Sequence, residues 1–255
     1  MTREHLWSIW IDDANLLPKF VVQYVETAKK FRRYTGETKD FHRERQGAPY
    51  NKTIKVVCQT CNSGWMGTIE TAVQPILTPL IKGQKIRLTQ AKRRTLTEWI
   101  TLKMLVAEHS GYRDHELDPI FTQADRNAFM YGRMIPSGVR IYLVRQESIV
   151  WATGYKRHAS GLGQEPPSFP PQKDPTGTKN VQAITWGLGR LLVYISAVTD
   201  PQIRPHFRFV KGPEFRRLWP LTQSDVNWPP PIRVDDAFVE DLAGALGRYL
   251  DASMG

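Results

Sequence analysis

Five side chains near the start of the chain could together support hydrolysis of a phosphodiester: Glu4, His5, Cys58, Cys61 and Asn62. Such hydrolysis needs a base that takes a proton from water and a cation that neutralises charge on the leaving oxygen. A histidine can be that base near neutral pH. A carboxylate and an amide oxygen are suitable ligands for a hard cation such as Mg²⁺. Glu4, His5 and Asn62 therefore form a candidate one-metal hydrolytic site.

The C-x-x-C pair, Cys58 and Cys61, has three interpretations from the residues alone. A structural zinc site takes four nitrogen or sulfur ligands. The sequence has only two cysteines, so His42 or another chain would have to supply the other ligands. A redox pair of the thioredoxin type usually opens a helix in a βαβ order, which this sequence lacks. The spacing could also be incidental. In each case, two cysteines predict a reducing compartment rather than a disulfide framework.

The candidate ligands lie where a strand is expected to give way to a helix. Thr53–Val57 alternates apolar and polar residues, as a short strand does, and leads directly into Cys58. The apolar spacing from Trp65 to Val73 predicts a helix after it. Pro75 and Pro79 are expected to end that helix.

The chain has two motifs in this region: Glu4-His5-Leu6-Trp7, and Val57-Cys58-Gln59-Thr60-Cys61-Asn62-Ser63-Gly64-Trp65-Met66 followed by Glu70. Together they resemble the HNH endonuclease superfamily, in particular a bacterial and phage subgroup with an E-H start and a C-x-x-C-N-x-G-W-M signature. Weaker similarity continues through Pro75–Gly83 and through Trp99, Lys103 and Glu108. The resemblance covers roughly the first hundred residues well and the rest of the chain poorly.

The resemblance implies a ββα-metal fold, in which one strand presents the base and a helix presents a metal ligand. His5 would be the general base, and Glu4 and Asn62 would hold Mg²⁺ or Mn²⁺. Asn51 is the nearest candidate for the middle asparagine, which steadies the loop that carries the base. Many relatives have a second C-x-x-C upstream of the E-H pair, whereas this chain starts three residues before Glu4. We therefore expect a Zn²⁺ site with half its usual ligands, a chain that has dispensed with zinc, or a start codon placed too far downstream.

The chain is strongly basic, with 35 Lys and Arg against 25 Asp and Glu, a formal net charge of +10 and a pI near 9.7. Polyanions are the usual partners of such a surface, nucleic acid first and anionic lipid second, and an ordinary basic soluble protein is the alternative. Cations in the first turns of a helix oppose the helix dipole, so anion binding explains them better than helix stability. DNA is the expected partner, with RNA as an alternative. The expected contacts are two loop arginines and three cations at a helix start: Arg43, Arg45, Lys92, Arg93 and Arg94.

The cellular location is predicted from the absence of a signal-peptide pattern and of a membrane-spanning apolar run. The N-terminus has no apolar core of a signal peptide. The most apolar run, Ile184–Val198, is interrupted by Arg190 and is too short to span a bilayer. We therefore expect a cytoplasmic protein with no membrane partner.

The order of the expected elements is α+β rather than alternating βαβ. We expect an HNH-like ββα-metal module at 1–85 and a mixed region of helices and antiparallel strands, without an assigned role, at 86–255. A flexible Pro/Gly-rich segment is expected at 161–177. The other expected elements are a helix over 20–33, a loop over 34–51, a helix from Thr89 to Gly111, a short helix capped by Thr122 and Asp125, a hairpin of 139–144 with 149–155, strands over 181–186, 191–198 and 206–210, and a last helix capped by Asp235 or Asp236.

The main functional hypothesis is a metal-dependent HNH-type endonuclease that hydrolyses DNA. One alternative is a non-catalytic nucleic-acid-binding or interaction protein on a degenerate HNH scaffold. Salt-dependent binding that survives loss of Glu4, His5 and Asn62 would indicate it. Another is a zinc-dependent regulatory protein without a role on DNA, which would bind stoichiometric zinc and no nucleic acid.

Overall fold

The computed structural model describes these residues: 2–5, 8–14, 16–17, 23–31, 38–46, 53–109, 119–160, 180–202, 210, 212–222 and 224–252. Helices and antiparallel sheets are combined in it, which confirms the α+β class. Among the described helices, none has both the length and the apolar character needed to cross a bilayer.

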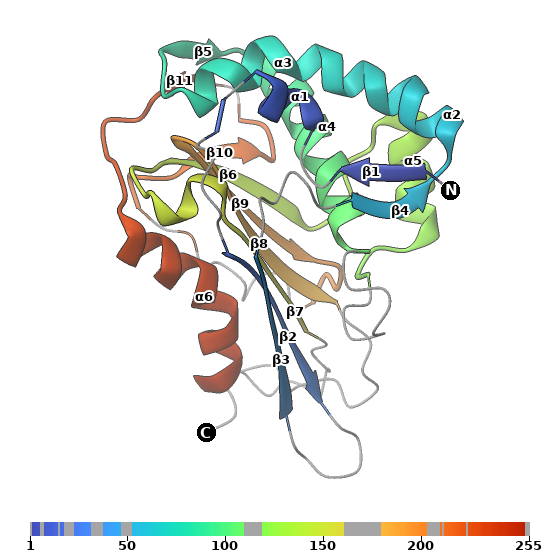
Figure 1. The fold of residues 1–255 in the computed structure, drawn as a ribbon, viewed down its shortest axis with the longest axis vertical. Helices are drawn as coiled ribbons and strands as arrows, with labels where there is room; N and C mark the ends of the chain where they lie inside the picture. Colours follow the sequence, from blue (N-terminus) through green and yellow to red (C-terminus); the bar gives the residue numbers. More distant parts are fainter. Residues whose placement is uncertain are drawn as a thin grey trace.

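A five-stranded antiparallel sheet forms the centre of the molecule (Figure 1). In spatial order its strands are β10 (Arg216–Trp219), β6 (Val139–Arg145), β9 (Leu191–Val198), β8 (Val181–Leu188) and β7 (Tyr155–Ser160). Strands β8 and β9 are buried at every position. Because successive side chains of a strand point to opposite faces, both faces of this sheet must be covered.

Helices α3 (Gly67–Ile81) and α4 (Gln90–Ala107) pack on one face of the sheet. Thr89 caps α4 and accepts a hydrogen bond from the Lys92 amide at 3.4 Å, which confirms the expected start of this helix. The larger core cluster also contains residues from both sides of the domain boundary expected at residue 85. It joins apolar side chains of the two helices to one face of the sheet: Leu77, Leu80, Leu96, Ile100, Ile141, Ile184, Trp186, Val193 and Ile195.

Helix α6 (Asp236–Ala252) packs on the opposite face (Figure 1). Asp235 accepts a hydrogen bond from the Phe238 amide at 2.9 Å, so the expected cap of the last helix is confirmed. The apolar side chains of α6 recur at the three- and four-residue spacing of one helix face and meet the alternate positions of the sheet. This second cluster includes Val144, Leu192, Tyr194, Val239, Leu242, Ala243 and Leu246.

A separate two-stranded antiparallel sheet pairs β1 (Thr2–His5) with β4 (Thr53–Val57). A nearly continuous helical segment begins after β4, made of the short α2 (Gln59–Cys61), the π-helical turn η2 (Asn62–Met66) and then α3. The expected strand and the helix that follows it are therefore confirmed.

Pro75 and Pro79 do not end this helix, because both lie inside α3, which continues to Ile81. A proline inside a helix loses a backbone hydrogen bond and costs about 3 kcal/mol. The side chains that surround and follow the prolines are buried in the core, and their burial offsets this cost: Ile76, Leu77, Leu80 and Ile81.

The helix expected over 20–33 and the loop expected over 34–51 are both wrong. Strands β2 (Gln23–Phe31) and β3 (Thr38–Gln46) pair along their whole length as an antiparallel hairpin. The hairpin lies alongside β7 (Figure 1). Pairing with a partner strand, which the local spacing of apolar residues does not report, overrides that spacing.

The hairpin expected between 139 and 155 is also wrong. Strand β6 pairs with β9 and β10, and Val150–Thr153 form a 3₁₀ turn, η4, in which Trp151 is buried. Pairing between strands distant in sequence decides the partners of β6. The segment at 161–177 and residues 206–209 of an expected strand lie outside the described residues.

The remaining elements are short. Helix α1 (Ile9–Asp13) follows β1, and α5 (Gln123–Gly132) starts with the expected capping box of Thr122 and Asp125. Strand β5 (Ile86–Leu88) pairs with β11 (Val226–Trp228), which brings the chain after β10 next to the start of α4. The expected strands over 181–186 and 191–198 are confirmed as β8 and β9.

Candidate functional site

Strand β1 presents Glu4 and His5 beside β4. The backbone register places Glu4 opposite Ile54 and His5 opposite Thr53, with an irregularity between Thr2 and Glu4. The Glu4 side chain is buried, whereas His5 is half-buried. Of the two candidate residues, His5 is therefore the more accessible to a substrate.

The helical segment after β4 returns alongside β1. Cys58 follows directly on the end of β4 that pairs with the start of β1. Further along the helix, Glu70 accepts a hydrogen bond from the Ser8 hydroxyl, just beyond the other end of β1. Asn62 lies between these two points, in the turn η2. The arrangement therefore places Asn62 on the helix that passes β1.

Lys103 of α4 lies at the centre of a buried polar cluster. Its Nζ is 2.6 Å from Glu4 Oε1 and 2.7 Å from Glu70 Oε1, and its side chain is 0% exposed. The same ammonium donates to the His5 carbonyl at 3.1 Å. Trp99 Nε1 donates to Glu70 Oε2 at 3.1 Å. The Lys103 cluster, which connects β1, α1, α3 and α4, consists of Glu4, Ser8, Trp10, Glu70, Trp99 and Lys103.

Opposite charges stabilise each other inside this cluster. Burial raises the pKa of Glu70, but the Lys103 ammonium and hydrogen bonds from Lys103, Ser8 and Trp10 outweigh it, so the pKa lies below its usual value. Burial likewise lowers the pKa of Lys103, while the carboxylates of Glu70 and Glu4 outweigh it and leave that pKa raised. Glu70 and Lys103 are therefore both ionised at neutral pH.

Sequence reasoning missed the Lys103 cluster as a site, because it treated Glu70, Trp99 and Lys103 only as parts of the resemblance. A signal was present in α4. Lys103 stands in the most apolar part of that helix, between buried residues on both sides. A lysine in such a position is almost never buried without a partner, so it predicts a carboxylate from another element.

The C-x-x-C pair starts the helical segment. Cys58 is exposed, Cys61 is partly exposed, and neither forms a disulfide. The Cys61 amide donates to Cys58 Sγ at 3.2 Å. Hydrogen bonds from the side chain and backbone of Cys61 lower the pKa of the Cys58 thiol, and the side-chain bond to Cys58 raises the pKa of Cys61. Cys58 is therefore the more readily ionised thiol, and the thiolate is the form that binds soft metals.

The residues expected to hold Mg²⁺ or Zn²⁺ each have a different environment in the structure. Within the described ranges, no group of three or more His, Cys, Asp or Glu side chains could hold a metal ion. Glu4 contacts Lys103, and the C-x-x-C pair gives zinc two thiol ligands. Asn51 lies outside the described residues. The donor types still fit a hard cation, since Glu4 and Asn62 supply a carboxylate and an amide oxygen.

Arg93, expected to contact nucleic acid, is buried at 0% exposure. Its guanidinium donates to the hydroxyl of Thr222 at 3.1 Å. It also donates, at 2.8 to 3.2 Å, to four backbone carbonyls of β10 and the segment after it: Arg217, Leu218, Thr222 and Ser224. A guanidinium held in this way does not reach a phosphate at the surface. We therefore correct its role: Arg93 fastens β10 and the following segment to α4.

The other expected nucleic-acid contacts are placed as follows. Lys92 Nζ donates to a backbone carbonyl of β5 at 3.4 Å, and Arg94 is exposed and lies 3.4 Å from Glu98. Both remain at the start of α4, beside Arg93. Arg43 and Arg45 belong to strand β3 rather than to a loop.

A second buried charged cluster surrounds Glu108, just after α4. Its Oε2 lies 2.6 Å from Arg126 Nη2, and its Oε1 accepts from Gln182 Nε2 at 3.0 Å. Burial raises the pKa of Glu108, and the guanidinium groups of Arg157 and Arg126 oppose this without cancelling it. These contacts connect α4, α5 and the sheet, which is a structural role.

Comparison with known proteins gives no match to a family model, to a curated protein or to a solved structure.

Proposed function

We propose that the chain is a metal-dependent endonuclease of the HNH type that hydrolyses DNA and acts in the cytoplasm. One observation carries the proposal: the strand that bears Glu4 and His5 pairs with the strand that leads directly into the helix bearing Asn62. This order of two antiparallel strands and a returning helix supports a ββα arrangement. The formal charge of +10 supports a polyanionic substrate.

In this proposal His5 is the general base. It lies at the end of β1 and is half-buried, and a base in that position can take a proton from an attacking water molecule. Glu4 and Asn62 would hold Mg²⁺ or Mn²⁺, with Glu4 shared between the cation and Lys103. When bound, the cation supplies neutralisation of the charge on the leaving oxygen.

Lys103 has a positioning role in the same proposal. Its ammonium bonds the side chain of Glu4 and the backbone carbonyl of His5, so it fixes the end of β1. A base displaced by about 1 Å can cost roughly a hundredfold in rate. The buried ion pair therefore keeps His5 in position at the end of β1.

A specific observation favours a second candidate, a non-catalytic nucleic-acid-binding protein. Glu4 already has an ion-pair partner in Lys103 at 2.6 Å. The described part of the chain also has no three-residue group of His, Cys, Asp or Glu suited to a metal. In that protein the Lys103 cluster is structural, and the basic surface alone holds nucleic acid.

Plasmid cleavage separates the two candidates. Purified protein is incubated with supercoiled DNA and Mg²⁺ or Mn²⁺, beside His5→Ala and the control Lys55→Ala, which changes an exposed residue of β4. Cleavage by the wild type and the control, lost in His5→Ala, supports the endonuclease. Equal cleavage by all three proteins would sink the role of His5. Salt-dependent DNA binding without cleavage, retained when Glu4, His5 and Asn62 are replaced together, identifies the second candidate.

A further inference from the structure

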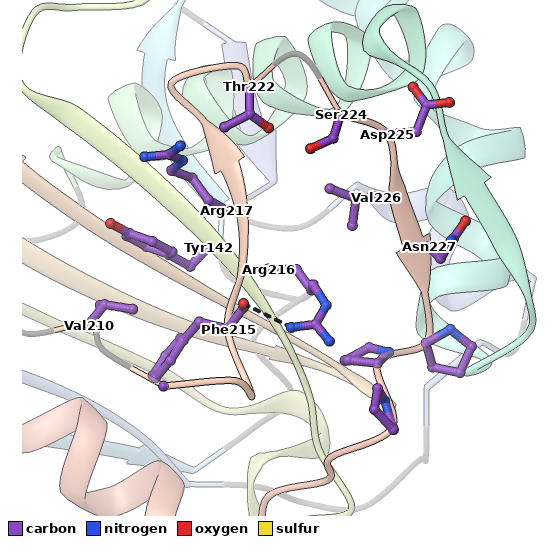
Figure 2. A pocket seen from close by; sticks show the side chains of 14 residues that line it. Tyr142, Val210, Phe215, Arg216, Arg217, Thr222, Ser224, Asp225, Val226 and Asn227 are labelled. Carbon is purple, nitrogen blue, oxygen red and sulfur yellow. Dashed lines mark hydrogen bonds between the residues drawn. The ribbon is translucent and has the colours of Figure 1, made fainter.

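A pocket of about 700 Å³ lies at the β10 edge of the central sheet (Figure 2). Pockets that hold small ligands usually measure about 300 to 1,000 Å³, so this one is large enough for a nucleotide. Its walls come from β6, β10, β11 and the segments beside them. Its lining includes two aromatic residues, two arginines and a threonine: Tyr142, Phe215, Arg216, Arg217 and Thr222.

Two arginines on β10 give the pocket positive charge. Neighbouring residues of a strand point to opposite sides, so Arg216 and Arg217 flank the edge strand. Arg217 is exposed, and Arg216 donates to the backbone carbonyls of Pro213 and Phe215. Among the described residues, neither arginine is ion-paired with an acid. Asp225, the acidic lining residue, is already paired with Arg87 at 2.6 Å.

Arg93 positions two polar residues that line the pocket, Thr222 and Ser224. The Arg93 guanidinium donates to the carbonyl of Thr222 at 3.0 Å and to the Thr222 hydroxyl at 3.1 Å. It also donates to the carbonyl of Ser224 at 2.8 Å. Among the described residues, the hydrogen-bond partners of its guanidinium are all neutral oxygens, so no carboxylate contacts it directly. The buried Arg93 guanidinium, directly behind these lining residues, adds to the positive potential in the pocket.

An aromatic surface lies next to Arg217. Tyr142 of β6 is the backbone partner of Arg217, and directly opposed residues of paired strands have neighbouring side chains. The Tyr142 and Phe215 rings meet edge to face with centroids 6.1 Å apart, and both are half-buried (Figure 2). Aromatic rings beside arginines are the combination that binds unpaired nucleotides, with stacking for the base and cations for the phosphates.

We propose that this pocket binds an unpaired nucleotide of a single-stranded nucleic acid, with its base against Tyr142 and Phe215 and its phosphate at Arg217. A base in a duplex is stacked between its neighbours and does not enter such a pocket. Binding here does not depend on cleavage at β1. Arg93 and Lys103 are separated along α4 by roughly 15 Å, at 1.5 Å per helical residue.

Fluorescence anisotropy with a labelled oligothymidine, in EDTA so that no cleavage occurs, tests the proposal. Arg217→Ala and Tyr142→Leu should each weaken binding by about tenfold, the loss expected for one phosphate contact or one stacked base. The matched control is Arg248→Ala, which removes one exposed arginine of α6 away from the pocket. Thermal melting checks that each variant is folded. Further arms use a duplex of the same length, thymidine monophosphate and inorganic phosphate.

Weaker binding in the two pocket variants, with the control unchanged and the single strand preferred over the duplex, supports the proposal. Equal weakening in all three variants would show a general charge effect and overturn it. Tight duplex binding that is unaffected by Tyr142→Leu would also overturn it. If the mononucleotide binds as tightly as the oligonucleotide, the assignment to a strand is overturned and a small nucleotide is the ligand. Because no metal is present, none of these results depends on nuclease activity.

Discussion

Lys103 on α4 and Glu4 on β1 form a buried ion pair with 2.6 Å between Nζ and Oε1. The pair fastens β1 to α4, although Glu4 and Lys103 are 99 positions apart in the sequence. Removing a charge from water costs several kcal/mol, and attraction to a second charge repays this only with good geometry and further hydrogen bonds. Glu70 and the His5 carbonyl supply these on the other sides of the ammonium.

Replacing Lys103 by Met should lower the free energy of unfolding by about 3–5 kcal/mol, because it leaves the Glu4 and Glu70 carboxylates buried without their cation. Urea unfolding measures the change. The matched control is Lys82→Met, an exposed lysine at the end of α3, for which a change within about 0.5 kcal/mol is expected. A Lys103→Met protein as stable as the control would show that the ion pair contributes nothing net.

Arg93→Met should destabilise the protein far more than Arg94→Met, although the two residues are neighbours on α4. Arg93 is buried and bonds four backbone carbonyls, and a buried acceptor left without a partner costs about 1–3 kcal/mol. Arg94 has only an exposed contact to Glu98, worth at most about 0.5 kcal/mol. Chemical unfolding of both variants measures the difference. Equal effects would contradict the role of Arg93 in holding β10.

Acid should destabilise the protein partly through His109. Burial and the nearby guanidinium groups of Arg126 and Arg157 lower the pKa of this histidine from 6.5 to about 4. The unfolded chain therefore binds a proton at a pH where the folded protein does not. Stability from this group is complete above pH 6.5 and falls as the pH drops towards 4.

His109→Gln should flatten that decline. Urea unfolding of the wild type and the variant, measured at several pH values between 6.5 and 4, gives the two slopes. Titration of the other groups is common to both proteins, so the difference in slope isolates His109. Parallel curves would mean that His109 keeps its ordinary pKa in the folded protein.

Cys58 should react with iodoacetamide faster than Cys61 at neutral pH. It is the more exposed thiol, and the hydrogen bonds from Cys61 lower its pKa, which increases its thiolate fraction. Cys61→Ala removes the side-chain bond, so the pH profile of Cys58 alkylation should move to higher pH. Mass spectrometry measures the rates, with Thr60→Ala as the control. An unchanged profile in Cys61→Ala would show that Cys61 does not tune Cys58.

The sequence by itself determined the local features of the fold. Strand β4, the helix after it, the caps at Thr89 and Asp235, and the capping box at Thr122 follow from residues within a few positions of one another. The same local patterns gave no indication of which strands pair. They therefore wrongly predicted a helix where β2 lies, and a local hairpin where β6 pairs with β9 and β10.

The tertiary structure alone decided what the charged residues do. From the sequence, the cations at the start of α4 oppose the helix dipole, and an anion was the expected partner. For Arg93 the partner is instead a set of carbonyls from β10 and the segment after it, more than a hundred residues later in the chain. Glu4 looked like a metal ligand, and the fold places Lys103 against it. Burial and long-range contact set the energy of a charge, and neither can be read from the spacing of neighbouring residues.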